Sequence, residues 1–211
     1  MMFKKILLTI LDIFLIPEEK IKFNEIYLNK TSHYKKELKE LYLDNVFVCL
    51  EYDENLKKYL KSFKFEYNKK LKFVFLEYLE KYWDIIIDKF NKEDIIVCWS
   101  PLYFINHIKR WYNQTYLLWE LFASKFNLRF SKILFKKKYT KSQSKLERKD
   151  RLKNLWWVFQ IKKKYKEKIS WKIIILIDDV VSSWTTANEI AKILKENWAK
   201  DVVWLFLASG N

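Results

Sequence analysis

Glycine is almost absent from this sequence. The 211 residues include one glycine, Gly210, together with two prolines and ten tryptophans. Average usage of about 7% predicts around fifteen glycines in a chain of this length. Tight turns between strands and helices need glycine, because it adopts a backbone with positive φ at little cost. The deficit is therefore difficult to reconcile with a turn-rich fold of ordinary composition.

Tryptophan stands at several positions where glycine is expected. Trp198 follows a helical segment, where a left-handed C-cap favours glycine. Trp171 lies in the turn before an apolar strand. The other tryptophans in turn-like or adjacent positions are Trp99, Trp111, Trp156, Trp157 and Trp184. Some bacterial lineages read the UGA codon as glycine, whereas other codes read it as tryptophan. Our hypothesis is that most or all ten tryptophans are glycines in the living cell. The alternative is a tryptophan-rich protein with aromatic clusters.

Cysteine and histidine are also scarce. Cys49 and Cys98 are far apart and belong to no CxxC motif, which excludes a zinc ribbon and a disulfide framework. This usage indicates a reducing, cytoplasmic location. The spacing of His33 and His107 does not support a metal site, and solvated or capping histidines are the expected alternative.

The chain has no apolar run long enough to span a bilayer. The N-terminal segment Met1–Lys20 has lysines followed by apolar residues, as a signal peptide does. However, Asp12 interrupts the run and no small-residue cleavage site follows it. We expect a docking helix that ends near Pro17.

Hydrophobic residues and lysine are abundant. Half of the residues are hydrophobic, which predicts a globular chain of one domain, or one domain with an appendage. The net charge of +15 is compatible with nucleic-acid binding. The lysines are scattered along the whole chain, however, which is more typical of a solvated surface than of a groove.

The C-terminal quarter has the pattern of a βαβ unit. Lys172 to Asp179 is a continuous apolar run that ends in two acids, as in a strand buried on both faces. The next segment places Ala187, Ile190, Ala191 and Leu194 on one helix face, and Asp201 to Ala208 is a second buried strand.

A similar unit precedes it. Ile95 to Cys98 is an expected strand, and the helix that follows has an apolar face containing Leu117, Leu118, Leu121 and Phe122. Ile133 to Phe135 is the expected next strand. The charged run 136–154 fits a solvated loop or an active-site flap. The fold class is therefore α/β, a mostly parallel sheet flanked by helices, with a helical segment before about Asn91.

Two acids and a hydroxyl-rich turn join the strand that ends at Asp179 to the helix that follows it. Asp178 and Asp179 end the strand, and Ser182, Ser183, Trp184, Thr185 and Thr186 follow them. A turn of this kind at a helix N-terminus presents successive N–H groups and hydroxyls to a monophosphate. Two carboxylates can accept hydrogen bonds from the vicinal hydroxyls of a sugar. The combination favours a ribose 5-phosphate ligand.

With glycine at position 184, the stretch IIILIDDVVSSGTT resembles the phosphoribosyl-pyrophosphate (PRPP) motif of type I phosphoribosyltransferases. Other segments resemble one branch, the ComF family of competence-associated proteins: CWSPLYF, RWYNQ, LDIFLIP, and the stretch with Gln143, Arg151 and Asn154. The resemblance covers roughly residues 45 to 210. The cysteines of the zinc ribbon of longer members are missing after LDIFLIP.

The resemblance implies residue roles. Asp178 and Asp179 would hold the ribose hydroxyls, partly through Mg²⁺, and residues 182–186 would bind the 5-phosphate. The turn at Trp99 and Ser100 would face the pyrophosphate. The expected residues that neutralise the leaving group are Arg110, Lys141, Arg148 and Arg151. Purine-salvage members carry an acid at the first loop position, where this chain has Ser182, which disfavours that activity.

Two classes of function follow from the resemblance. The first is an enzyme that transfers ribose 5-phosphate from PRPP to a nitrogen nucleophile of unknown identity. The second is a DNA-uptake accessory or ligand-sensing protein without turnover, whose partners would be single-stranded DNA or the competence machinery. We expect an N-terminal helical segment at residues 1–90, a phosphoribosyltransferase-like domain at 91–211, and a homodimer as one possible assembly.

Overall fold

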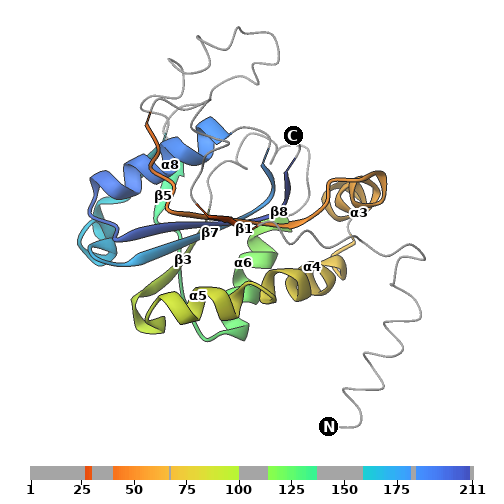
Figure 1. Cartoon of the computed structure of the whole chain (residues 1–211), viewed down its shortest axis with the longest axis horizontal. Helices are drawn as coiled ribbons and strands as arrows, with labels where there is room; N and C mark the ends of the chain where they lie inside the picture. Colours follow the sequence, from red (N-terminus) through yellow and green to blue (C-terminus); the bar gives the residue numbers. More distant parts are fainter. Residues whose placement is uncertain are drawn as a thin grey trace, which may run out of the picture.

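The computed structural model describes residues 27–29, 40–66, 68–99, 114–136, 159–181 and 184–209. A six-stranded sheet lies at its centre (Figure 1). In spatial order the strands are β1 (Tyr27–Asn29), β2 (Asn45–Leu50), β8 (Asp201–Ser209), β7 (Ile173–Val181), β3 (Ile95–Trp99) and β4 (Arg129–Ser131). The pairs from β2 to β4 are all parallel, and β1 pairs with β2 antiparallel. The mostly parallel sheet confirms the predicted fold class.

Strand β7 is central, as its sequence predicts. It pairs with β8 on one side and with β3 on the other, where Ile173 faces Ile95 and Ile177 faces Trp99. Its apolar residues from Ile173 to Ile177 are all buried. A strand that is apolar on both faces requires cover on both faces, which a central position between two helical layers provides.

The two faces of the sheet bury separate hydrophobic cores. One core joins alternate strand residues, such as Ile175 and Leu205, to helices α3 (Glu54–Phe65), α4 (Leu71–Glu80), α5 (Trp83–Lys89) and α6 (Gln114–Lys125). The other core joins the intervening residues, such as Leu176 and Trp204, to helix α8 (Trp184–Glu196). Figure 1 shows α8 on the opposite side of the sheet from α5 and α6. The period-2 alternation of strand side chains produces this division.

The two helices that flank the central strands bury the expected kind of face. In α8, the apolar residues Ala187, Ile190, Ala191 and Leu194 are all buried, as their spacing predicts. In α6, Leu118 and Phe122 are buried as predicted, whereas Leu117 and Leu121 are only half-buried. Their places in the core are taken by Trp119 and Ala123, which are also buried. The buried face of α6 is therefore rotated slightly from the predicted one.

One predicted strand belongs to a different sheet. The strand beside β3 is β4, not the segment Ile133 to Phe135. Most of that segment forms β5 (Leu134–Lys136), which pairs with β6 (Phe159–Ile161) in a separate two-stranded sheet. Ile133 and Leu134 are buried in the core on the α8 side, so they cover a face of the main sheet rather than extend its edge.

The segment before residue 91 contributes to the sheet as well as to the helical layer. It supplies α3, α4 and α5, and also β1 and β2, which its helical pattern did not indicate. Buried residues on both sides of position 90, including Phe75 and Ile175, share one core. The expected docking helix at the N-terminus lies outside the described residues. None of the helices in the described part of the chain is long and apolar enough to cross a bilayer.

Candidate functional site at the carboxyl ends of β3 and β7

The chain leaves β3 and β7 toward opposite faces of the sheet. Helix α6 follows β3 and packs in the core that contains α4, whereas α8 follows β7 and packs in the other core. Strands β3 and β7 are neighbours in the sheet. In open α/β sheets, this reversal leaves a crevice at the carboxyl ends of the two strands, and ligands bind there. The sequence motifs predict a ligand site beside Asp178 and Asp179, which lie at this end of β7.

Two buried carboxylates mark this end of β7. Asp178 is 9% exposed and Asp179 is 7% exposed. The Asp178 Oδ1 atom accepts a hydrogen bond of 2.9 Å from the Asp179 backbone N–H, and the Asp179 Oδ1 atom accepts one of 2.7 Å from the Val180 N–H. Buried carboxylates are rare unless their charge is compensated.

Lys64 supplies part of that compensation. Its Nζ atom lies 2.9 Å from the Asp179 Oδ2 atom, and both side chains are largely removed from water. The lysine comes from the last turn of α3, whose C-terminal end is fixed by Phe63, buried and packed edge-on against Phe75. Sequence reasoning missed Lys64, because one lysine among 41 basic residues carries no local signal. Only the packing of α3 brings it to the site.

The predicted phosphate turn lies between β7 and α8. Ser182 and Ser183 are outside the described residues, and Trp184 is the first residue of α8. Thr185 and Thr186 are half-buried in the first turn of that helix, where backbone N–H groups have no partner within the helix itself. Trp184 is only 6% exposed, and its ring packs edge-on against Phe206 at 5.8 Å.

Three tryptophans stand close to the carboxyl half of β7. Trp99 ends β3 directly opposite Ile177. Trp119 donates a hydrogen bond from its Nε1 atom to the Ile177 carbonyl oxygen. Trp184 contacts Phe206, which pairs with Asp178 in the sheet. The rings of Trp119 and Trp184 are both buried, one in each of the two hydrophobic cores.

The remaining predicted site residues fall outside the described part of the chain. They are Ser100, Arg110, Lys141, Arg148 and Arg151. The expected flap from Tyr139 to Asp150 is also outside it. Their roles stay predictions.

The donor chemistry of the site suits Mg²⁺. The described residues contain no cluster of three or more histidine, cysteine or acidic side chains that could hold a metal alone. Mg²⁺ is commonly held by one or two carboxylates together with waters and substrate phosphates. Asp178 and Asp179 provide two adjacent carboxylates, which fits this partial coordination.

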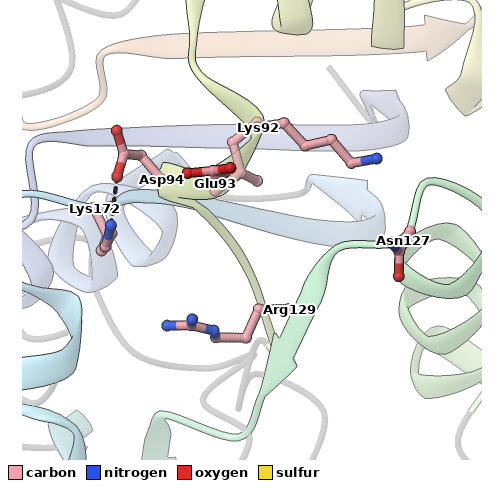
Figure 2. Close-up of a pocket in the computed structure, with 7 residues that line it drawn as sticks. Lys92, Glu93, Asp94, Asn127, Arg129 and Lys172 are labelled. Carbon is pink, nitrogen blue, oxygen red and sulfur yellow. Dashed lines mark hydrogen bonds and ion pairs between the residues drawn. The ribbon is translucent and has the colours of Figure 1, made fainter.

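An open cavity of about 630 Å³ lies at the other end of the sheet. It is lined by residues at the amino ends of β3, β7 and β4, including Asp94, Lys172 and Arg129 (Figure 2). Figure 2 shows Lys172 directed at Asp94, with which it forms an ion pair, and Arg129 standing apart from them. Because these residues lie at the amino ends of the strands, the cavity is remote from Asp178 and Asp179, and we do not assign the ligand site to it.

No known family model matches the sequence. Competence protein F of Haemophilus influenzae is 31% identical over 106 residues, which cover 49% of this chain and 46% of that protein. The match therefore spans less than half the length of this curated relative. Among solved structures, a hypoxanthine phosphoribosyltransferase of Trypanosoma cruzi is 10% identical, with a TM-score of 0.41 over 66% of this chain and 64% of that one. The allosteric regulatory enzyme of purine biosynthesis is 14% identical, with a TM-score of 0.36 over 61% of this chain and 25% of that one.

The fold defines an α/β protein with a mostly parallel sheet and two buried carboxylates at the end of its central strand. Over these 106 residues the chain is similar to competence protein F, which agrees with the resemblance to the ComF family that its sequence motifs indicate.

Proposed function

We propose that this chain binds PRPP with Mg²⁺ at the carboxyl end of β7 and transfers ribose 5-phosphate to a nitrogen nucleophile. The observation that carries the proposal is the buried pair Asp178–Asp179, placed at the sheet's topological reversal and immediately before the N-terminus of α8. An acidic pair beside a helix N-terminus matches a ligand with a diol at one end and a phosphate at the other.

Each group in the site has a separate task. The carboxylates of Asp178 and Asp179 accept hydrogen bonds from the ribose hydroxyls, which fixes the sugar ring. The N-terminus of α8 and the hydroxyls of Thr185 and Thr186 bind the 5-phosphate. The same two carboxylates would help to hold Mg²⁺, which would supply positive charge to offset that of the departing pyrophosphate. The protein thereby holds the reacting carbon in position and stabilises an oxocarbenium-like transition state, mainly by positioning and electrostatics.

Pyrophosphate release from PRPP, measured against a panel of nucleobases, tests the enzyme proposal. We expect release with one acceptor class, and we expect Asp179→Asn to reduce it by about 10²-fold or more, because it removes a charge that positions the ligand. Asp94→Asn is the matched control, since it makes the same change at the opposite end of the sheet. Equal activity of Asp179→Asn and its parent would contradict the site assignment.

A second candidate is a DNA-uptake accessory protein that binds the ligand without turnover. The similarity to competence protein F and the net charge of +15 favour it. Single-stranded DNA binding by the same preparation, measured across a salt series, distinguishes the two functions. Binding that weakens steeply with salt, without any pyrophosphate release, would favour the accessory role.

We propose in addition that tryptophan occupies glycine positions in this chain. Trp198 has a φ angle of 67° and is 72% exposed. The Ala199 N–H donates to the Leu194 carbonyl and the Trp198 N–H donates to the Lys195 carbonyl. These two bonds form a Schellman motif, whose left-handed position is usually glycine. A bulky side chain in that conformation costs about 1–2 kcal/mol.

Trp171 occupies a second glycine position. The Lys172 N–H donates to the Ile169 carbonyl across a four-residue turn, in which Ser170 has φ −57° and ψ 127° and Trp171 has φ 59°. These angles fit a type II turn, whose third position requires a positive φ and favours glycine. The Trp171 side chain is 71% exposed, so no burial of its ring offsets the backbone cost.

The buried tryptophans support the same proposal for a different reason. The Nε1 atom of Trp204 is buried and has no hydrogen-bond partner among the described residues. An unsatisfied buried donor costs about 1–3 kcal/mol. Near the carboxyl end of β7, glycine in place of Trp119 or Trp184 would free the space that their buried rings now occupy.

The intact mass of the protein isolated from its own cells tests the proposal directly. Each replacement of tryptophan by glycine lowers the mass by a fixed, large amount, so the mass counts the replacements. A mass equal to that of the printed sequence would contradict the proposal.

Calorimetry links the glycine proposal to PRPP. We expect the Trp184→Gly form to bind PRPP–Mg²⁺ at least tenfold more tightly than the chain with tryptophan at this position. The reason is that the amides of a phosphate loop must approach the anion to about 2.7–3.2 Å, which a bulky side chain hinders. Trp198→Gly, which is remote from the carboxylates, is the control. No binding by the Trp184→Gly form would contradict the PRPP proposal.

A further inference from the structure

The ion pair between Lys64 and Asp179 involves one of the two carboxylates that we propose to contact the ligand. The Lys64 Nζ atom lies 2.9 Å from the Asp179 Oδ2 atom, with exposed fractions of 18% and 10% for the two side chains. Such a pair is weakly screened by salt, because water and ions have little access to it. The ammonium therefore holds the same carboxylate that a metal and a ribose hydroxyl would contact.

The summed charge of Lys64, Asp178 and Asp179 changes sign when a divalent cation is added. Asp178, Asp179 and Lys64 carry two negative charges and one positive charge, which sum to −1. Adding Mg²⁺ without displacing the ammonium changes this sum to +1 in a poorly hydrated place. Uncompensated charge in such surroundings is unfavourable. An anionic ligand that pairs with the Lys64 ammonium offsets this excess positive charge.

We infer that Lys64 is an exchangeable counter-ion of Asp179, an inference that rests on the proposed PRPP function. In the free protein Lys64 competes with divalent cations for Asp179. In the complex its ammonium pairs with phosphate oxygens of the ligand, and Asp179 becomes available to the metal and the ribose. Lys64 thereby makes metal binding depend on the polyphosphate that accompanies the metal.

The packing of α3 permits this exchange without a change of fold. The helix is anchored by buried Leu56, Leu60 and Phe63, and Asp53 caps its N-terminus by accepting a hydrogen bond of 2.8 Å from the Leu56 N–H. Lys64 itself has a flexible four-carbon stem. Its ammonium can therefore move between partners by side-chain rotation while the helix stays in place.

Binding of Mg²⁺ alone to the full chain tests the competition. We expect Lys64→Met to bind Mg²⁺ about tenfold more tightly than the parent in calorimetry, because the competing ammonium is gone. Lys61→Met removes an exposed charge from the same helix and should change little. Lys64→Arg keeps a cation at the site and should retain the weak metal binding of the parent. Unchanged Mg²⁺ affinity in folded Lys64→Met would overturn the inference.

Binding of PRPP–Mg²⁺ tests the second half of the exchange. In the Trp184→Gly form, we expect Lys64→Met to weaken PRPP–Mg²⁺ binding about tenfold, the opposite sign to its effect on Mg²⁺ alone. Weaker binding of both would indicate a purely structural role and would overturn the inference. If Lys64→Met unfolds, as judged by circular dichroism, Lys64→Gln replaces it in both titrations.

The titrations distinguish a failure of the proposed PRPP function from a failure of the inference about Lys64. If no form of the chain binds PRPP but Lys64→Met still gains Mg²⁺ affinity, the proposed function is wrong and the competition at Asp179 stands. If PRPP–Mg²⁺ binds and Lys64→Met changes neither titration, the proposed function stands and the inference about Lys64 is wrong.

Discussion

Three residues other than glycine have a positive φ angle in the described part of the chain: Asn127, Trp171 and Trp198. Asn127 closes a Schellman motif after α6, in which the Leu128 N–H donates to the Ala123 carbonyl and the Asn127 N–H donates to the Ser124 carbonyl. Asparagine adopts this conformation at little cost, whereas a bulky residue such as tryptophan adopts it only with backbone strain. The same motif thus ends two helices, once with a suitable residue and once with an unsuitable one.

We expect Trp198→Gly to raise the free energy of unfolding by about 1 kcal/mol, because it relieves the strained backbone. Trp198→Ala is the informative control, since it removes the aromatic ring but keeps the Cβ atom that causes the strain. Asn127→Gly should change stability by only a few tenths of a kcal/mol. Urea unfolding measures all three. Equal stabilisation by alanine and glycine at position 198 would show that the ring, not the backbone, is responsible.

The two cysteines should be unreactive in the folded protein. Both are fully buried, and burial raises the pKa of the Cys98 thiol to about 12 and that of Cys49 further above its usual range. The reactive thiolate is therefore almost absent near pH 8. We expect a thiol reagent to label neither cysteine in the native protein and both in denaturant. Rapid labelling of native protein would contradict the buried positions in β2 and β3.

At the scale of elements, an ion pair joins the start of β7 to the short helix before β3. Lys172 pairs with Asp94 of the 3-10 helix Lys92–Asp94, next to the cavity of Figure 2. The hydrogen bond and positive charge of Lys172 lower the pKa of the Asp94 carboxyl below its ordinary value. The pair thus links the amino ends of two central strands.

This ion pair should contribute to stability in a pH-dependent way. Because the pKa of Asp94 is lowered in the folded state, its contribution is present above the ordinary carboxyl pKa and is lost as pH falls through the folded value. We expect Lys172→Met to lower the urea midpoint at pH 7, and this difference to shrink in acid. Lys168→Met, at an exposed neighbouring lysine, should show no such trend. A difference in urea midpoint that grows in acid would contradict the predicted direction of this pH dependence.

The elements that could be predicted from the sequence are those with a dense local signal. The strand β7, the buried face of α8 and the strand β8 follow from continuous apolar runs and helical spacing. The sequence could not show to which sheet the strand β5 belongs, since a short apolar run does not reveal whether it extends a sheet or covers one. Lys64 could not be found either, because its role depends on a contact between residues 115 positions apart in the chain.

At the scale of the whole molecule, both halves of the chain contribute to the same sheet and to the same hydrophobic core. Strand β2 pairs with β8, and helices α3, α4 and α5 cover one face of the sheet. The core on that face includes Phe47, Leu79 and Ile86 from the first half and Ile175 and Leu205 from the second.

We therefore expect the fragment 91–211 not to fold cooperatively by itself, because it would expose the sheet face that α4 covers and the edge of β8 with which β2 pairs. The fragment 40–211, which keeps both, should fold. Thermal unfolding followed by near-ultraviolet circular dichroism compares the two. A sharp transition for 91–211 would show that the expected division near residue 90 marks an independent folding unit.

The pairing of β2 with β8 also has a consequence for synthesis on the ribosome. Strand β2 is made early, yet its parallel partner is the last strand of the chain. At about 5–20 residues per second, residues 45–50 emerge several seconds to half a minute before β8 exists. Their sequence, NVFVCL, is almost entirely apolar. Throughout that interval the nascent chain presents a hydrophobic strand without its parallel partner β8, which is the kind of segment that chaperones at the tunnel exit bind.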